Sequence, residues 1–584
     1  MKLKNRNLAA YLAFICKVNS LQISNEVRNK ILNHIGKLDT LVLVVLNTYI
    51  LILDFLSKII FFKPLREIKD NQIALLKKLL FIFNFFIRKV DQVIFVIANL
   101  HIYGDEELKE ISLRSYKNND LNHYKFIIIG SGPSGAVTAS ELAKIYGGEV
   151  LIIEKGDYFE IPKSKHPGEE FFKKWYRGGI NSTYFKEMIA YSSGSCFGGG
   201  SEINSGLYHR PDAAFLKEWQ DEYSTIELDQ NSIDEFSYKV EDLINVEENL
   251  DEKFSSIFVK GANIGKEKYS NLDRFYDNIK KSKNSMSETL LKDYLKNDGD
   301  VALNTDVKKI EYKNDQWKIK TLQDNKLKYF SCDYLFLCCG SIFTNNLLLK
   351  SAISKEKKKI ISRFTFHPMI KMIGTYQEDV QDLNEDVNSY QNMNFWPDFI
   401  IGNASSSIQF LTSSFQENIY IKKFIEVNWK KMKVFHATFS MGFGKIICLP
   451  FIKEPILFYF IKNSDKKIIQ NASFKLFNFI KNTGAKFIIP ITEKNSEIMK
   501  ISKEDNQHLL ETTKKFQISS VHVLGGVTMG ENENCVSDSF GKINNYKNLY
   551  VNDSSLINTK LLKNPQGTIM MIAYRNISNF LQSL

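Results

Sequence analysis

One continuous stretch, residues 124–156, limits what this chain can fold into more than any other part of it. It reads YKFIIIGSGPSGAVTASELAKIYGGEVLIIEKG. An apolar run, a glycine-rich turn, a run with helical spacing and a second apolar run follow one another, which predicts strand, turn, helix and strand. Such a unit packs its helix against two parallel strands. We therefore expect an α/β domain built around it.

The turn of this unit has the spacing G-x-G-x-x-G. Gly130 allows the tight turn, Gly132 lets a pyrophosphate approach the backbone, and Gly135 lets the helix pack on the strand. Pro133 and Ser134 open the helix, whose unpaired N–H groups and positive dipole favour phosphate. The turn therefore predicts a phosphate-binding site.

An acid follows at the position that an adenine nucleotide requires. Glu154 ends the second strand, 19 residues after Gly135, where a carboxylate binds the ribose hydroxyls. This unit alone does not distinguish FAD from NAD. A glycine-rich turn without a ligand is the alternative.

A second glycine cluster, GSCFGGGSEINSGLYHRP, covers residues 194–211. Five of its residues are glycine, in a chain where only 30 of 584 are. Glycine loses more backbone entropy on folding than any other residue, so a cluster needs a reason. Either a ligand lies close to this backbone, or the segment only needs special turn geometry.

Several separated motifs, in order, make residues 120–584 resemble the glucose-methanol-choline (GMC) flavin oxidoreductases. Besides the nucleotide fingerprint they are GGGSEINSGLYHRP (198–211), SMSETLLKDYLKNDG (285–299), LNTDVKKI (303–310), DYLFLCCGSIFTNNLLLKSAI (333–353), and HVLGGVTMG (522–530) with NPQGT (564–568). The resemblance implies an α/β fold with an α+β substrate domain. A Rossmann-like FAD/NAD(P)-binding domain would interleave with an antiparallel-sheet substrate domain, after an N-terminal helical extension.

The resemblance also divides the chain. The helical extension would cover 1–120. The FAD-binding domain would comprise 121–225, 285–350 and 520–584, and the substrate domain 226–284 and 351–519.

FAD is the cofactor that the resemblance implies, with the second glycine cluster along the flavin ring. Some members carry a histidine, covalently bonded to the flavin, where this chain has Ile203, so we expect non-covalent FAD. No metal site is indicated. Besides the fingerprint residues, the expected FAD contacts are Gly199, Gly200, Ser201, Asn204, Val307, Asp553, Ser554 and Pro565.

Two residues are expected to carry the chemistry, which is oxidation of an alcohol to an aldehyde or ketone. An imidazole with a pKa near 6.5 can take the hydroxyl proton, and the resemblance gives this role to His522. Asn564 matches the position that orients the substrate oxygen. Structural roles are the alternatives, a core histidine for His522 and a helix N-cap for Asn564. His209 and His367 are expected to be structural.

The substrate and the electron acceptor are less constrained. Residues 455–489 are most similar to the long-chain alcohol branch of the family, which favours a lipid-like primary alcohol. A sugar or polyol is the alternative substrate class. A third interpretation is a protein that binds flavin but catalyses no reaction. The acceptor could be oxygen, a quinone or a carrier protein.

The N-terminal 100 residues are apolar and basic. They hold 15 Lys and Arg against 6 Asp and Glu, whereas the whole chain has a net charge of +11. This local excess argues against a nucleic-acid partner and is compatible with an anionic membrane surface. A packed helical bundle, an in-plane membrane contact and a span over 41–62 are the alternatives. Seven cysteines without paired spacing suit a reducing compartment, so we expect a cytoplasmic protein, peripheral on a membrane if it contacts one.

Overall fold

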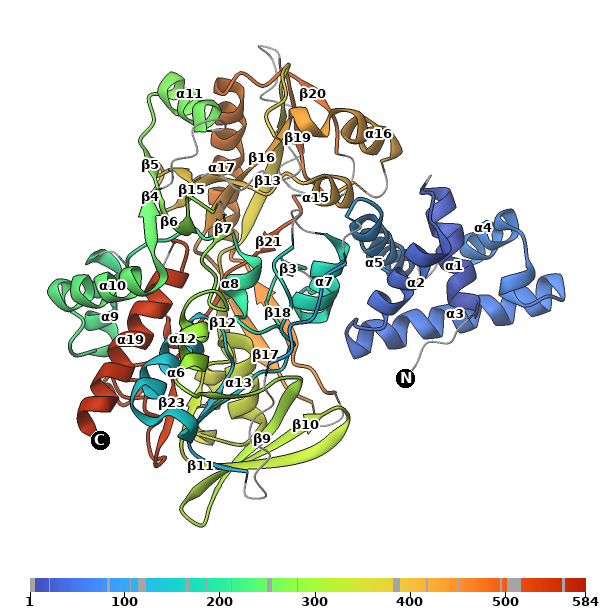
Figure 1. The fold of residues 1–584 in the computed structure, drawn as a ribbon. Coiled ribbons are helices and arrows are strands. Elements are labelled where there is room, and N and C mark those ends of the chain that lie inside the picture. Colours follow the sequence, from blue (N-terminus) through green and yellow to red (C-terminus); the bar gives the residue numbers. More distant parts are fainter. Residues whose placement is uncertain are drawn as a thin grey trace.

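We describe the protein from a computed structural model, in which an N-terminal group of helices lies beside two intermixed larger parts (Figure 1). The structure describes residues 6–19, 21–80, 84–104, 107–113, 122–162, 167–184, 187–211, 213–248, 255–280, 282–381, 389–415, 418–449, 452–493, 496–501, 516–558 and 562–584. The predicted combination of an α/β domain, an antiparallel-sheet domain and a helical extension is confirmed.

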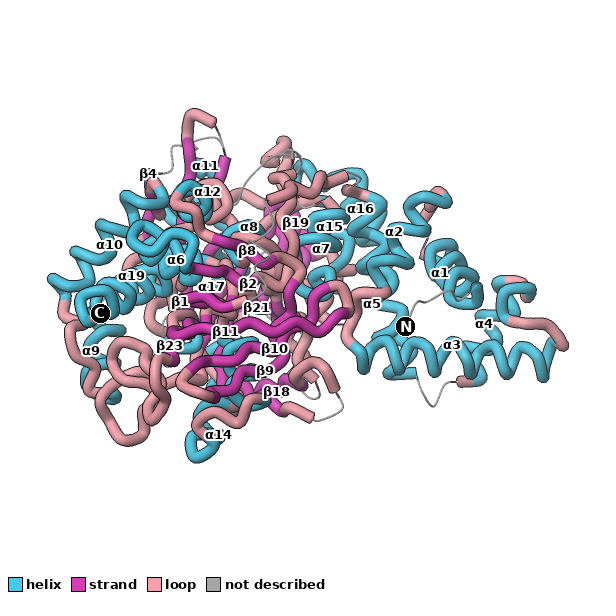
Figure 2. Tube along the Cα trace, turned by 60° about the horizontal axis from the view of Figure 1, so that its bottom comes forward, coloured by secondary structure: helices cyan, strands magenta, loops and turns pink. Residues whose placement is uncertain are grey.

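A seven-stranded sheet forms the centre of the nucleotide-binding domain (Figure 2). Its order is β8-β2-β1-β11-β10-β9, and β23 pairs with β11. The strands are β1 (His123–Ile129), β2 (Val150–Ile153), β8 (Asp300–Ala302), β9 (Thr305–Lys313), β10 (Gln316–Gln323), β11 (Lys326–Leu337) and β23 (Leu549–Val551). β8, β2, β1, β11 and β23 pair in parallel. β9, β10 and β11 form an antiparallel meander.

Helices cover both faces of this sheet, which explains why β1 is almost entirely apolar. Phe126 and Ile128 pack on one side with residues of α6, α12 and α19, whereas Ile127 and Ile129 pack on the other with residues of α9 and α13. These helices are α6 (Pro133–Tyr146), α9 (Ala213–Tyr223), α12 (Leu290–Lys296), α13 (Ser341–Lys350) and α19 (Gln566–Ser583).

A mainly antiparallel sheet of nine strands forms the substrate domain. Its main path is β20-β19-β13-β16-β15-β14-β5, with β21 paired to β13 and β3 paired to β21. The strands are β3 (Ala190–Tyr191), β5 (Tyr269–Asn271), β13 (Met369–Thr375), β14 (Tyr390–Asn392), β15 (Phe399–Ala404), β16 (Met432–Phe439), β19 (Phe487–Pro490), β20 (Met499–Lys500) and β21 (Ser519–Ser520). Helices α11 (Ser255–Gly265) and α17 (Asn463–Asn482) contribute to the apolar cluster on one face.

Smaller elements complete these two domains. The order β18-β17-β12-β22 makes a four-stranded sheet, and β4-β6-β7 makes a three-stranded one. Their strands are β12 (Arg363–Phe366), β17 (Phe443–Ile447), β18 (Ile456–Phe460), β22 (Val523–Leu524), β4 (Val246–Glu248), β6 (Asp273–Asp277) and β7 (Ser282–Lys283). The other helices are α7 (Gly168–Lys174), α8 (Gly200–Ile203), α10 (Gln230–Ile244), α14 (Lys358–Ile361), α15 (Ile408–Ser413) and α16 (Ile419–Asn428).

The N-terminal extension is a helical module with its own apolar core. Its helices are α1 (Arg6–Val18), α2 (Asn25–Ile35), α3 (Thr40–Phe61), α4 (Asp70–Leu79) and α5 (Asn84–Ile102). The module docks through α5, which lies against α7 and α15 (Figure 1). Asp39 adds a buried ion pair, because it accepts the N–H of Leu41 at 2.7 Å to cap α3 and also lies 2.5 Å from Arg177.

One helix of the described residues is long and apolar enough to cross a membrane, by length and composition. This helix is α3, with a mean hydropathy of 2.0 over an 18-residue window that is 33% buried. Its buried residues are Leu46, Tyr49, Ile50, Leu53, Asp54 and Ser57, and its opposite side is exposed.

Candidate active site

A cavity of about 870 Å³ is lined by residues of both larger domains. One end is lined by the fingerprint turn, the end of β2 and the start of α13. The other end is lined by β13, β15 and β16 of the substrate sheet, together with the segment before β22 and the start of α19. A volume of this size is typical of a ligand or cofactor site.

The fingerprint turn opens onto the first end of the cavity. Helix α6 begins at Pro133, and its N-cap Gly132 makes no side-chain hydrogen bond, so the first N–H groups stay available to an anion. A Cβ atom at Gly132 would meet nothing within 4 Å, and Ser134 lines the same space. The predicted phosphate site therefore faces an open volume.

The other two fingerprint glycines serve packing. Gly130 has a φ of +101°, and a Cβ atom there would lie 2.4 Å from the carbonyl oxygen of Cys338. A Cβ atom at Gly135 would lie 2.0 Å from the carbonyl oxygen of Gly130. Side chains are therefore excluded at both positions by the close approach of helix, turn and strand.

Glu154 lines the cavity where β2 ends, and part of its hydrogen-bonding capacity is already used. One carboxylate oxygen accepts from the N–H and the hydroxyl of Ser131, at 3.0 and 2.7 Å, and the other accepts from the N–H of Gly156 at 2.9 Å. These bonds fix the carboxylate. The remaining lone pairs can accept from ribose hydroxyls.

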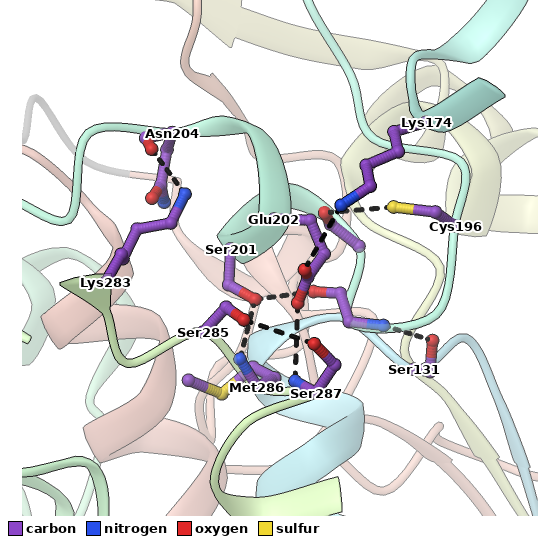
Figure 3. Close-up of polar contacts among 12 residues, drawn as sticks. Ser131, Lys174, Cys196, Ser201, Glu202, Asn204, Lys283, Ser285, Met286 and Ser287 are labelled. Carbon is purple, nitrogen blue, oxygen red and sulfur yellow. Dashed lines mark hydrogen bonds and ion pairs between the residues drawn. The ribbon is translucent and has the colours of Figure 1, made fainter. Parts of the chain in front are cut away.

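The second glycine cluster is held from behind by a buried polar network (Figure 3). Gly198 donates its N–H to the hydroxyl of Ser131 at 3.1 Å. Glu202 accepts the N–H of Ser287 at 3.3 Å and lies 3.9 Å from the ammonium group of Lys174, which is also buried. Gly198 has a φ of +93°, and a Cβ atom there would lie 2.2 Å from the Glu202 carboxylate.

Four of the five glycines of this cluster line the cavity, and they include the two expected to contact the flavin, Gly199 and Gly200. Gly199 has a φ of +57°, and a Cβ atom there would lie 2.7 Å from the Cα atom of Gly132. A Cβ atom at Gly200 would meet nothing within 4 Å, so this residue presents bare backbone to the cavity. Ile203 lines the cavity too.

The structure corrects the expected role of the Ser201 side chain. Its hydroxyl donates to the carbonyl oxygen of Gly198 at 2.8 Å and accepts the N–H of Met286 at 3.0 Å, and the residue is buried outside the cavity lining. It braces the turn instead. Asn204 does line the cavity, but its amide group donates to Gln566 at 2.6 Å.

The remaining expected cofactor contacts, Val307, Asp553, Ser554 and Pro565, also line the cavity. The Asp553 carboxylate accepts the N–H of Gly340 at 2.9 Å and the N–H of Ser555 at 2.8 Å, and burial raises its pKa. Ser554 accepts the N–H of Ser341 at 3.0 Å. Both side chains therefore join the segment after β23 to the start of α13.

His522 lines the substrate end of the cavity, and its ring is held by a second histidine. Its Nδ1 atom lies 3.0 Å from Nδ1 of His367, and the two rings are nearly perpendicular, at 88°. Burial lowers the pKa of His522 to about 4, so its ring is neutral at pH 7. His367 is buried and outside the cavity lining, in keeping with the expected structural role.

Asn564 lies on the cavity wall just before α19. Its carbonyl oxygen accepts from the amide of Gln391 at 3.1 Å, and its N–H donates to Nδ1 of His209 at 3.3 Å. Burial lowers the pKa of His209 to about 3, with smaller contributions from Lys563 and His522. The Asn564 side chain is thus oriented with its oxygen engaged, which leaves its NH₂ group to donate.

Sequence reasoning missed four residues that shape the site: Lys174, Glu202, Lys371 and His436. Glu202 lies within the second glycine cluster, and an acidic residue inside that motif was the signal that could have identified it. Lys371 interrupts the otherwise apolar run of β13, MIKMIGT. Lys174 and His436 carried no comparable signal, because their positions depend on contacts between distant segments.

The sequence of the chain also matches the models of a known protein family. Family models described as GMC oxidoreductase match residues 124–369 and 454–573. The chain belongs to the GMC oxidoreductase family. The matched residues include both catalytic candidates and both glycine clusters.

Relatives of this GMC oxidoreductase are distant. An uncharacterised GMC-type oxidoreductase of Sinorhizobium fredii is 25% identical over 477 residues, which cover 77% of this chain and 93% of that protein. A long-chain-alcohol oxidase of Arabidopsis thaliana is 24% identical over 503 residues, which cover 77% of this chain and 67% of that protein.

Solved structures share the fold at still lower identity. Pyridoxine 4-oxidase from Mesorbium loti aligns with a TM-score of 0.60 and 11% identity, over 79% of this chain and 99% of its own. Formate oxidase of Aspergillus oryzae aligns with a TM-score of 0.61 and 12% identity, over 80% and 100%.

FAD is the cofactor of this GMC oxidoreductase, and the described residues fit it. The open volume at Gly132, the uncapped start of α6 and the fixed Glu154 carboxylate suit a dinucleotide. The bare backbone at Gly200 suits a flat ring system. These residues would hold the cofactor in the cavity that also contains His522.

Proposed function

We propose that this GMC oxidoreductase oxidises an alcohol to an aldehyde or ketone. FAD, when bound, accepts the hydride that leaves the alcohol carbon. The hydroxyl proton passes to Nε2 of His522, and the oxygen keeps its bonding pair to form the carbonyl. Asn564 donates a hydrogen bond from its NH₂ group to that oxygen and so orients it.

The observation that carries this proposal is the paired arrangement of His522 and His367. Nδ1 of His522 faces Nδ1 of His367, and in the tautomer in which Nδ1 of His522 carries the proton and donates it to His367, Nε2 is the acceptor. Among the described residues no hydrogen-bond partner occupies Nε2. The low pKa of about 4 keeps the ring neutral and able to accept a proton at pH 7.

Anaerobic flavin reduction tests the proposal. A panel of aliphatic, sugar and aryl alcohols is mixed with the purified holoenzyme, and the loss of flavin absorbance near 450 nm is followed. His522→Ala should slow reduction by about 10² to 10⁴-fold while FAD stays bound. Asn564→Ala should slow it less. Failure of every alcohol to reduce the wild-type flavin would contradict the proposal and favour a flavin protein without turnover.

A lipid-like alcohol is the substrate class that we propose first. The likeness to a long-chain-alcohol oxidase supports it. So does the segment 455–489, where β18, α17, a turn at Gly484 and β19 follow one another. A sugar or polyol remains the rival, and the same panel separates the two classes by kcat/KM.

We also propose that α3 lies in the plane of an anionic membrane surface. Its exposed side forms a helical stripe of large apolar residues, Val44, Leu51, Phe55 and Ile59, and the exposed Phe62 follows directly after the helix. Its buried side carries Asp54, which accepts the N–H of Leu65 at 2.8 Å and pairs with Lys58 at 2.7 Å. A carboxylate fixed in this way opposes a span and favours an in-plane contact. The basic excess of the module complements anionic lipids.

Vesicle flotation tests the membrane contact. The full-length holoenzyme should float with phosphatidylserine-containing vesicles, and less so as salt rises. The double change Leu51→Glu and Phe55→Glu should abolish flotation. Val427→Glu, at a still more exposed apolar position on α16, should not. Equal flotation of both variants would contradict the proposal and leave α3 as part of a packed module.

A further inference from the structure

Lys371 is a cation on the part of the cavity wall that the substrate sheet forms, and Lys563 lines the cavity beside Asn564. It lies in β13 between Ile370 and Met372, which are fully buried, and it lines the cavity. Among the described residues no ion pair or hydrogen bond engages its ammonium group. Burial alone lowers its pKa, to about 8, with no contribution from a nearby acid. The group is therefore mostly charged at pH 7 and uncompensated.

The neighbour of Lys371 across the sheet does not neutralise it. Lys371 pairs in register with His436 of β16, which pairs in turn with Gly402 of β15, so the two side chains share one face. Gly402 makes room for the ring, because a Cβ atom there would lie 2.8 Å from Nε2 of His436. Nδ1 of His436 lies 2.7 Å from the hydroxyl of Thr438. Burial lowers the pKa of His436 to about 3, so this ring is neutral.

A charge left unpaired in a protein interior opposes folding by several kcal/mol. At this position a methionine would fill the same volume without that penalty. The lysine ends instead in a cavity that also contains His522 and Asn564. Its position therefore indicates a partner that arrives with the substrate.

We propose that Lys371 binds an oxyanion of the substrate, so that the alcohol oxidised here carries a carboxylate or a phosphate near its hydroxyl. This inference rests on the proposed oxidation of an alcohol, and it departs from the neutral lipid-like class named above, because it selects hydroxy acids or phosphate esters of glycols. A plain long-chain alcohol would leave Lys371 unpaired in the closed site.

The hydroxyl and the oxyanion of such a substrate must fit the same cavity. Lys371 pairs in register with His436, and Met369, two residues before Lys371, pairs with Ser519, three residues before His522. Lys371 and His522 both line this cavity, so one substrate must reach from the ammonium group to the imidazole. A hydroxy acid whose spacer spans the two groups meets this condition.

Paired substrates test the inference. Short ω-hydroxy acids are compared with their methyl esters, and glycol monophosphates with the free glycols, by anaerobic flavin reduction in the holoenzyme. The wild type should prefer one anionic series by at least about tenfold in kcat/KM, a difference of about 1.4 kcal/mol. The preferred series identifies the oxyanion. Lys371→Met should remove the preference.

A matched control and a binding measurement complete the design. Lys445→Met makes the same change at an exposed strand position outside the cavity lining and should keep the preference. Butyrate and ethyl phosphate, which have no hydroxyl group to oxidise, are titrated against the flavin spectrum. Lys371→Met should raise the Kd of the tighter-binding probe at least tenfold.

Three results would overturn the inference. In the first, the wild type oxidises both members of each pair with the same kcat/KM. In the second, Lys371→Met slows both members by the same factor. In the third, Lys371→Met leaves the Kd of butyrate and ethyl phosphate unchanged. Equal slowing of both members would instead indicate that the ammonium group acts on the flavin. If no alcohol reduces the flavin, the proposed function fails, whereas the butyrate and ethyl phosphate titrations still decide whether Lys371 binds an oxyanion.

Discussion

At the scale of single residues, the site depends on buried groups whose charge state is set by their surroundings. His522 is the clearest case, since burial moves its pKa from 6.5 to about 4. The ring must be neutral to accept a proton, so activity is retained above the folded pKa and lost as the pH falls through it. We expect kcat/KM for alcohols to be flat from about pH 5 to 7.

Stopped-flow pH jumps check this expectation by measuring anaerobic flavin reduction between pH 3.5 and 8. The rate of flavin reduction should fall to half of its plateau value near pH 4. A midpoint near pH 6.5 would mean that the ring titrates as an exposed histidine does, and it would contradict the burial described for the site.

Ile203 leads to a second residue-scale prediction, on how the flavin is attached. An isoleucine side chain has no nucleophile, and Ile203, which lines the cavity, stands where we expect the linking histidine of some family members. Acid precipitation of the holoenzyme should therefore release all of the FAD into the supernatant. A yellow pellet after washing would show a covalent bond at another residue.

At the scale of elements, one ion pair joins the N-terminal module to the nucleotide-binding domain. Asp39 caps α3 and pairs with Arg177 at 2.5 Å, and both side chains are buried. Asp39→Ala removes the cap and leaves the guanidinium buried without its partner. We expect a loss of about 3–5 kcal/mol in the free energy of unfolding.

Urea unfolding followed by tryptophan fluorescence measures this loss. Asp70→Ala, at a more exposed acid that pairs with Lys17, is the matched control and should change stability by less than about 1 kcal/mol. A similar loss in both variants would contradict the role of the buried pair.

The elements that sequence could predict are those with local signals. The fingerprint turn, α6 and the meander of β9, β10 and β11 follow from glycine spacing and from alternation within a few dozen residues. The row formed by Lys371, His436 and Gly402 could not be predicted in the same way. It depends on the register of three strands from distant segments, which no local pattern records.

The same limit applies to side-chain direction inside a motif. The resemblance placed Ser201 at the flavin, whereas the structure turns its hydroxyl toward Gly198 and Met286. A serine in a tight helical turn can bond either to the backbone or to a ligand. Only the position of residues 285–287, which lie more than 80 positions away, decides between them.

At the scale of the whole molecule, four histidines with lowered pKa values link stability to pH. Burial lowers the pKa of His34, His209 and His436 to about 3 and that of His522 to about 4. In the unfolded chain they titrate near 6.5. The unfolded state therefore binds more protons below pH 6.5, and stability falls as the pH drops from 6.5 toward 4.

The urea midpoint at several pH values checks this slope. Each group contributes at most about 1.4 kcal/mol per pH unit. His34 lies in the N-terminal module, outside the cavity lining. His34→Gln should reduce the pH dependence of the free energy of unfolding by the contribution of one titrating group. A midpoint that does not change between pH 7 and pH 5 would contradict the prediction.

The cavity draws its walls from segments that begin at Ile129 and end at Ile569, so that nearly the whole catalytic part of the chain meets around it. A ligand that binds only this assembled form adds its binding free energy to folding. At a free FAD concentration 100 times its Kd, this linkage is worth about 2.7 kcal/mol. Vitamin supply would then set how much of the protein persists in a cell, as well as how fast it works.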